Sequence, residues 1–114
     1  MNIQIFGSKK SADSRKAEMF FKERRIRYQY IDMNEKGMSR GEFETVLKSV
    51  GGPDLMIDEK CKDGDLIALF KVILDSEKKD KLFENQYAIK LPVVRNGKEA
   101  TVGYMPDIWK KWMV

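Results

Sequence analysis

The chain has 114 residues, of which 42% are hydrophobic and 35% charged, and its formal net charge at pH 7 is +4. This length and apolar content predict one domain, spanning residues 1–114. No apolar run approaches the ~20 residues of a membrane-spanning helix, and the short apolar start is followed by charge rather than by a cleavage site. We therefore expect a cytoplasmic protein without a membrane partner.

The sequence contains no histidine and a single cysteine, Cys61. Histidine is the commonest general base and the commonest metal ligand, so its absence argues against a metal site. One cysteine rules out an intramolecular disulfide and fits a reducing compartment. We expect neither a bound metal nor a resident cofactor.

Basic residues are concentrated in the first part of the chain. Residues 1–31 hold eight lysines and arginines against three acidic residues, so most of the positive field belongs there. Four of these, Lys22, Arg24, Arg25 and Arg27, form a run that fits either a solvated helix end or a contact with acidic protein or nucleic acid. No nucleic-acid motif accompanies the run, and we expect no direct nucleic-acid binding.

The first elements in chain order are a strand, a loop, a helix and a second strand. Apolar residues predict a strand over residues 2–6 and a loop over residues 7–10, and Ser11 is a good N-cap for a helix to about Arg25. Residues 28–32 are rich in strand formers. These elements form a βαβ unit, whose two strands should be parallel.

The middle of the chain is predicted to be helical. Ser39 and Glu42 make a capping box that opens a helix ending at a Gly-Gly-Pro stop. Residues 66–74 show a second apolar helical face, the charged run over residues 76–81 is expected to be solvated, and residues 82–89 return to apolar spacing as a last middle helix.

The C-terminal part predicts a hairpin and a helix. A strand opened by proline covers residues 91–95, Asn96-Gly97 is a strong hairpin signal, and residues 100–104 form the returning strand. A helix follows from Pro106, in which Trp109 and Trp112 are spaced to pack onto the sheet; a partner-binding face is the alternative.

This order of elements indicates an α/β fold. A β-α-β unit, a helical insert at about residues 36–90 and a final β-β-α unit give a four-stranded mixed sheet with packed helices. This is the thioredoxin-like layout.

The loop at residues 5–17, Ile-Phe-Gly-x-x-x-Ser-x-x-Ser-Arg-Lys-Ala, resembles the first loop of the arsenate reductase (ArsC) family and its Spx-type relatives. The segment from Glu84 to Val94 resembles the family's approach to its proline-led strand, and residues 102–104 match its closing strand. The resemblance covers nearly the whole chain in order. Glutaredoxins offer a competing resemblance in the C-terminal half, but the long segment from Met33 to Leu91 favours the ArsC branch.

The chain departs from this family at the residues that do its chemistry. The resemblance implies a nucleophilic cysteine at Ser11 and, in many Spx-type proteins, a second cysteine at Ser14. It also implies one arginine at Leu91 and another near Ile57 or Asp58. A serine hydroxyl cannot form the sulfur adducts or disulfides on which that chemistry depends, so arsenate reduction by the family route looks lost.

Two hypotheses describe the Ser11 loop. In the first, the start of the helix, with Lys9, Lys10, Ser11, Ser14 and Arg15, retains a pocket for an anion or an acidic partner. In the second, Ser11 only caps the helix and the lysines are solvated.

Two further residues belong to these hypotheses. The resemblance implies that Pro92 is cis and shapes the pocket, against the alternative of an ordinary trans proline. Cys61 is either a redox-sensing or displaced catalytic thiol or an inert cysteine.

The sequence therefore favours a redox-inactive, non-catalytic ArsC/Spx-like protein that regulates or binds. By Spx analogy its protein partner would be RNA polymerase, with a small anion as the other ligand. The alternative is an arsenate reductase-like or glutathione-linked thiol oxidoreductase that uses Cys61, with glutathione or thioredoxin as reductant.

Overall fold

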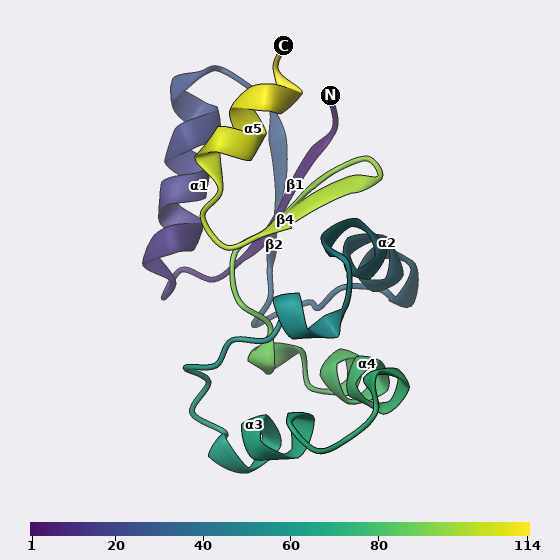
Figure 1. The fold of residues 1–114 in the computed structure, drawn as a ribbon. Coiled ribbons are helices and arrows are strands. Elements are labelled where there is room, and N and C mark those ends of the chain that lie inside the picture. Colours follow the sequence, from purple (N-terminus) through teal and green to yellow (C-terminus); the bar gives the residue numbers. More distant parts are fainter.

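The computed structural model describes residues 1–114 and confirms the predicted four-stranded mixed sheet (Figure 1). Its strands follow the order β2-β1-β3-β4: β1 (Ile3–Gly7), β2 (Tyr28–Asp32), β3 (Val93–Asn96) and β4 (Glu99–Val102). β1 is parallel to β2 and antiparallel to β3, and β3 pairs antiparallel with β4. The first βαβ unit and the last hairpin thus supply the whole sheet.

The helices lie on both faces of the sheet and beyond its end. α1 (Ala12–Glu23) and α5 (Pro106–Trp112) cover one face, and α2 (Arg40–Val50) covers the other. α3 (Gly64–Phe70) and α4 (Asp75–Glu84) lie below the sheet in Figure 1. Two short 3-10 helices, η1 (Pro53–Leu55) and η2 (Gln86–Ala88), join these parts. None of the helices combines the length and apolar character that crossing a bilayer requires.

The side chains of β1 alternate between two hydrophobic clusters. Ile3 and Ile5 pack with Phe21 and Trp109 in the cluster under α1 and α5. Phe6 belongs to the larger cluster, which includes residues of α2, α3 and α4. Successive strand residues point to opposite faces, so both faces of the central strand are buried.

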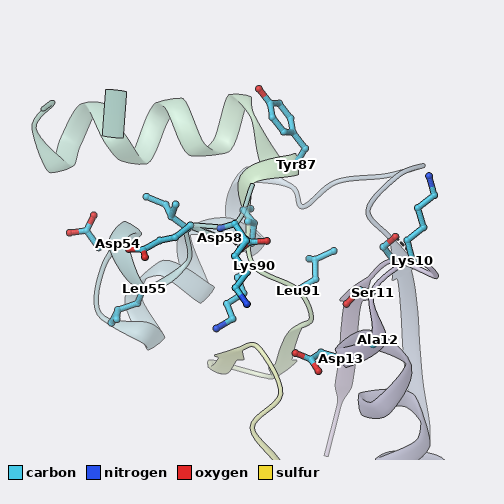
Figure 2. Close-up of a pocket in the computed structure, with 15 residues that line it drawn as sticks. Lys10, Ser11, Ala12, Asp13, Asp54, Leu55, Asp58, Tyr87, Lys90 and Leu91 are labelled. Carbon is cyan, nitrogen blue, oxygen red and sulfur yellow. Dashed lines mark hydrogen bonds between the residues drawn. The ribbon is translucent and has the colours of Figure 1, made fainter. Parts of the chain in front are cut away.

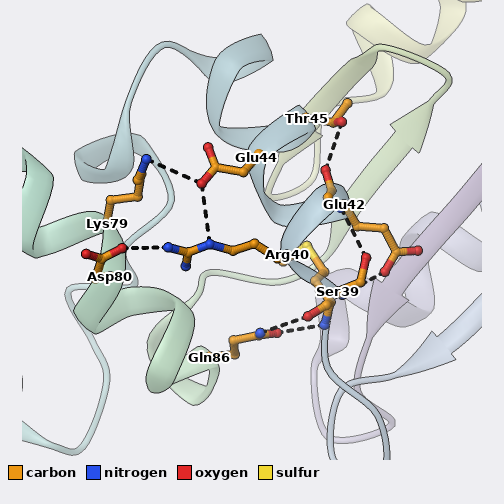
Figure 3. Close-up of polar contacts among 10 residues, drawn as sticks. Ser39, Arg40, Glu42, Glu44, Thr45, Lys79, Asp80 and Gln86 are labelled. Carbon is orange, nitrogen blue, oxygen red and sulfur yellow. Dashed lines mark hydrogen bonds and ion pairs between the residues drawn. The ribbon is translucent and has the colours of Figure 1, made fainter.

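Ion pairs join α2 to α4 on the surface of the helical insert (Figure 3). The Arg40 guanidinium lies 2.7 Å from Asp80 and 3.6 Å from Glu44, and Lys79 lies 3.3 Å from Glu44. Arg40 also stacks over the Phe83 ring, 4.6 Å from its centroid. A single exposed ion pair contributes little to stability. Here, however, one guanidinium pairs with carboxylates of two helices and so links α2 to α4.

The Gln86 side chain holds η2 against the start of α2 (Figure 3). Its amide oxygen accepts from the Met38 N–H at 2.7 Å, and its amide nitrogen donates to the Met38 carbonyl at 3.0 Å. Directly after Met38, the capping box of Ser39 and Glu42 is present as predicted. The two ends of the helical insert therefore meet beside the sheet.

The structure corrects the expected boundaries of the middle helices. α3 ends at Phe70 rather than continuing to residue 74, and residues 76–81 belong to α4. The prediction that this charged run is solvated was wrong for Lys78, which is only 8% exposed. Its ammonium group lies 2.7 Å from Asp54 and 3.5 Å from Asp75, and the hydrogen bond to Asp54 raises the pKa of Lys78. A long side chain can bury its stem while its charge stays paired, which apolar periodicity does not detect.

Other boundaries moved by one or two residues. α1 ends at Glu23 instead of about Arg25, because Arg25 adopts a left-handed conformation with φ of 56°. β3 begins at Val93, after the proline, and β4 begins at Glu99 and ends at Val102. Helix and strand ends are the least specified part of a sequence pattern.

Trp109 should contribute far more to stability than Trp112. Trp109 is completely buried, its indole N–H donates to Thr101 Oγ1 at 2.8 Å, and its ring contacts Phe20, Phe21 and Tyr104. We expect Trp109→Ala to lower the free energy of unfolding by ~3–5 kcal/mol. Trp112→Ala, at a partly exposed position, should cost less than half as much. Urea denaturation followed by circular dichroism measures both; equal losses would contradict the core assignment of Trp109.

Candidate functional site

The loop between β1 and α1 is held closed by the Ser8 side chain. Ser8 Oγ accepts hydrogen bonds from the Lys10 N–H at 3.3 Å and from Asn34 Nδ2 at 3.0 Å. The Ser8 carbonyl accepts from the Ser11 N–H at 3.0 Å. Because Asn34 lies two residues after the end of β2, this one side chain ties the loop to the neighbouring strand.

Gly7 and Ser14 make the closest approach between β1 and α1. Ser14 is completely buried, and its Oγ accepts from the Ser8 N–H at 3.3 Å. A Cβ atom on Gly7 would lie 2.8 Å from Ser14 Oγ and 2.9 Å from the Tyr30 hydroxyl. Only glycine fits at this position, and Ser14 is therefore occupied with holding the loop.

Ser11 caps α1, as predicted. Its backbone is extended and its Oγ accepts from the Ser14 N–H at 3.1 Å. The N–H groups of Ala12 and Asp13, in the first turn, have no acceptor within the protein. The helix therefore presents two free donors beside Ser11, in the partly positive field of its N-terminus.

A cavity of about 850 Å³ opens between this loop and the helical insert (Figure 2). In Figure 2, Lys10 and Ser11 lie on one side, with Asp58, Lys90 and Leu91 on the other. Its lining comes from three parts of the chain: Ser8, Lys10, Ser11, Ala12 and Asp13; Asp54, Leu55, Ile57, Asp58, Glu59 and Lys60; and Tyr87, Ile89, Lys90 and Leu91. We call this cavity the Ser11 pocket.

Two backbone hydrogen bonds, which together make one isolated bridge, fix the far wall of the Ser11 pocket. Ile57 and Ile89 form an isolated antiparallel bridge, and the Lys90 N–H donates to the Met56 carbonyl at 2.8 Å. The Asp58 N–H donates to the Ala88 carbonyl, also at 2.8 Å. The second and third lining segments are therefore one rigid wall facing the loop.

The charges around the Ser11 pocket are mixed. Lys10, Lys60 and Lys90 oppose four carboxylates, which are Asp13, Asp54, Asp58 and Glu59. These acids are not grouped in a way that could hold a metal ion. A free anion would meet attraction and repulsion together in this pocket, so its electrostatics suit a ligand that carries both charges.

The proline-led strand borders the same pocket. The Leu91–Pro92 peptide bond is cis, which confirms that prediction. Pro92 is buried, and its carbonyl accepts from the Gly103 N–H at 2.8 Å. Leu91 and Ile57 both line the pocket. Leu91 and Ile57 are therefore apolar walls of the cavity, at or near positions where the resemblance implies arginines.

The other candidate residues lie elsewhere. Lys9 is exposed and does not line the pocket, and its carbonyl accepts from Arg15 Nη1 at 2.5 Å. Arg15 lines a separate groove on the other side of α1. Of the predicted loop residues, only Lys10 and Ser11 face the pocket.

Cys61 also lies outside the lining of the Ser11 pocket. It is partly buried against the larger hydrophobic cluster, and its N–H donates to the Asp58 carbonyl at 3.0 Å. Its preceding neighbours, Glu59 and Lys60, do line the pocket. The thiol is therefore near the pocket along the chain but is not part of its wall.

The sequence did not point to Tyr87 as a site residue. Its hydroxyl donates to Asp63 Oδ2 at 2.6 Å, while Asp63 Oδ1 accepts from the Leu66 N–H and caps α3. The Tyr87 hydrogen bond, followed by that from Leu66, lowers the pKa of Asp63, and the same bond raises the pKa of Tyr87. No local pattern signals this pair, since its partners lie far apart in sequence.

Comparison with solved structures shows that the chain has the fold of ArsC-type arsenate reductases and related proteins. A candidate ArsC family related protein from Bacteroides fragilis matches with a TM-score of 0.85 at 18% identity, over 97% of each chain. A candidate arsenate reductase from Yersinia pestis gives 0.80 at 16%, over 96% of this chain and 98% of that one. An arsenate reductase from Vibrio cholerae gives 0.77 at 20%, over 97% of each.

Comparison with family models and with curated protein sequences gave no match. The likeness to these proteins is therefore one of fold, at 16–20% sequence identity. The structural likeness confirms the fold that the resemblance implied.

Gly7→Ala should destabilise the protein and disturb the Ser11 loop. The added Cβ would overlap Ser14, and such overpacking costs ~1–3 kcal/mol. Gly41→Ala is the matched control, because nothing lies within 4 Å of its Cβ and alanine suits a helix better than glycine. Thermal melting and amide shifts at residues 8–14 measure the effect. A Gly7→Ala protein as stable as the control would contradict the close packing described.

Tyr87→Phe should raise the pKa of Asp63 toward its ordinary value, because it removes the larger cause of the shift. In the native protein the folded-state pKa of Asp63 lies below its ordinary value. The ionised carboxylate therefore stabilises the fold at pH values above the ordinary carboxyl pKa, and this stabilisation is lost as the pH falls through the lowered pKa. The variant should lose less stability than the native protein over that acid range. Carboxylate NMR titration measures the pKa, with Tyr104→Phe as control; an unchanged Asp63 would refute the assignment.

Proposed function

We propose that this chain is a non-catalytic protein of the ArsC and Spx group that acts by binding a partner at the Ser11 pocket. The observation that carries the proposal is the composition of the pocket, whose lining includes neither a cysteine nor an arginine. Ser11 stands where the resemblance implies the nucleophile, and its hydroxyl is used to cap α1. An alcohol in that place cannot carry thiol–disulfide chemistry.

The rest of the lining supports binding over reaction. Leu91 and Ile57 give the pocket apolar walls, and neither can hold an oxyanion. The three lysines would attract a free phosphate or arsenate and the four carboxylates would repel it, whereas a protein segment can place acidic groups beside the lysines and basic groups beside the carboxylates. A segment of a protein partner, with both charges and an apolar side chain, matches this lining better than a small anion does.

The protein partner that the resemblance implies is RNA polymerase, because Spx-type proteins bind it. Lys10 and the free N–H groups of Ala12 and Asp13 are the donors on the loop side of the pocket. Lys60 and Lys90 are the cations on the far wall that could pair with a carboxylate. If the ligand is instead a small anion, the same donors would hold it.

A thiol oxidoreductase that uses Cys61 is the second candidate. It is favoured by the position of Cys61 beside the lining residues Glu59 and Lys60, and it would draw electrons from glutathione or thioredoxin. It is opposed by the partial burial of the thiol against the hydrophobic cluster. We rank it below the binding function.

The native protein should not reduce arsenate or disulfides. The assay supplies glutathione or thioredoxin as reductant and compares the native protein with Cys61→Ala. We expect both proteins to match the rate without protein, because no thiol lines the pocket. Turnover that disappears in Cys61→Ala would overturn the proposal in favour of the oxidoreductase.

Binding should depend on the lysines of the pocket. Bacterial RNA polymerase is immobilised and titrated with native protein and with a Lys10→Glu, Lys90→Glu variant. Lys48→Glu, Lys71→Glu is the matched control, since both residues are exposed and neither lines the Ser11 pocket. We expect at least ~10-fold weaker binding for the pocket variant only, by like-charge repulsion.

A phosphate titration, followed by amide shifts at residues 11–15, separates the small-anion form from the protein-partner form. If phosphate shifts these amide signals and RNA polymerase does not bind, the ligand of the Ser11 pocket is a small anion. No binding of either ligand would contradict the proposal.

A further inference from the structure

A second groove, of about 520 Å³, lies between α1 and α5 and adjoins the Ser11 pocket only at Ala12. Its rim carries Arg15, Lys16, Arg24 and Lys110, all exposed, against the single carboxylate of Glu23. Of these cations, only Lys16 forms an ion pair, with Asp13 at 3.8 Å, and an exposed pair of this kind has little strength. The groove is therefore strongly and locally positive, unlike the Ser11 pocket.

Apolar side chains form the middle of this groove. Met19 is 54% exposed and Tyr104 is 40% exposed, and both line it. Exposed methionine is typical of surfaces that bind peptides, because its flexible thioether adapts to the partner. An apolar centre with a charged rim is the usual arrangement of a docking site.

Two of the cations are held in place by the aromatic rings beneath them. The Arg24 guanidinium lies 3.8 Å from the centroid of the Phe20 ring and donates to the Phe20 carbonyl at 3.1 Å. The Lys16 ammonium lies 5.7 Å from the centroid of Tyr104. Cations positioned in advance lose less freedom when a partner binds.

We propose that this groove docks an acidic segment of a protein partner. Carboxylates of the segment would pair with Lys16, Arg24 and Lys110, and an apolar side chain would contact Met19 and Tyr104. The complementary charge argues for an acidic occupant, and it does not depend on what the Ser11 pocket binds.

The aromatic geometry argues against single-stranded nucleic acid as the occupant. Base binding needs a free ring face for stacking. The Tyr104 ring has Lys16 over it and makes an edge contact with Trp109, with ring centroids 5.5 Å apart. Phe20 is buried under Arg24. A base that stacked on Phe20, or on the covered face of Tyr104, would first have to displace the cation that lies over the ring.

The test titrates native protein with a short fluorescein-labelled peptide of alternating glutamate and leucine. The same titration is repeated with its glutamine counterpart and with labelled single-stranded oligodeoxythymidine. The groove variant is Lys16→Glu, Arg24→Glu, Lys110→Glu, and the control with equal charge change is Lys48→Glu, Lys71→Glu, Lys98→Glu, whose positions are exposed and outside the groove. Thermal melting establishes that each variant is folded, and Met19→Ser is a second groove variant without a charge change.

We expect the acidic peptide to bind native protein and to shift the amides of Met19, Tyr104 and Lys110. The groove variant should bind at least ~10-fold more weakly and the control variant less than ~2-fold more weakly, and binding should fall with added salt. Failure of the native protein to bind the acidic peptide, equal losses in both charge variants, or tighter binding of the oligonucleotide would overturn the proposal. Shifts confined to Lys10, Ser11 and Leu91 would place the peptide in the Ser11 pocket and would also overturn it.

Discussion

The close approach of α1 to β1 is the constraint on which the rest of the site depends. Gly7 has no side chain, so buried Ser14 can lie against it and accept the Ser8 N–H. Ser8 then binds Asn34 and ties the loop to the end of β2. With the loop held in this way, the first turn of α1 faces the Ser11 pocket with two free N–H groups.

The Ser11 pocket is a junction between two parts of the fold. Its loop side belongs to the βαβ unit, and its far wall belongs to the helical insert, braced by the Ile57–Ile89 bridge. The insert is attached through the Gln86–Met38 hydrogen bonds and the ion pairs of α2 with α4. The geometry of the pocket thus depends on contacts that are far from Ser11 in the sequence.

The Ser11 pocket and the groove between α1 and α5 differ in charge. The Ser11 pocket has three lysines and four carboxylates, whereas the groove beside α5 has four cations and one carboxylate. Arg15 lies in the groove, although its position in the loop suggested the pocket. Successive helical residues project in different directions, so neighbours in the loop sequence serve different surfaces.

The sequence by itself determined the α/β class, the parallel and antiparallel pairing, and the capping roles of Ser11 and Ser39, because these follow from local spacing and residue chemistry. It also showed that a serine stands where the resemblance implies a cysteine. Only the tertiary structure decided which side chains share a cavity. The carboxylates of the pocket, the buried Lys78 and the Tyr87–Asp63 pair come from segments that packing brings together. A charged residue is solvated or paired according to its neighbours in space, and those neighbours leave no periodic trace in the sequence.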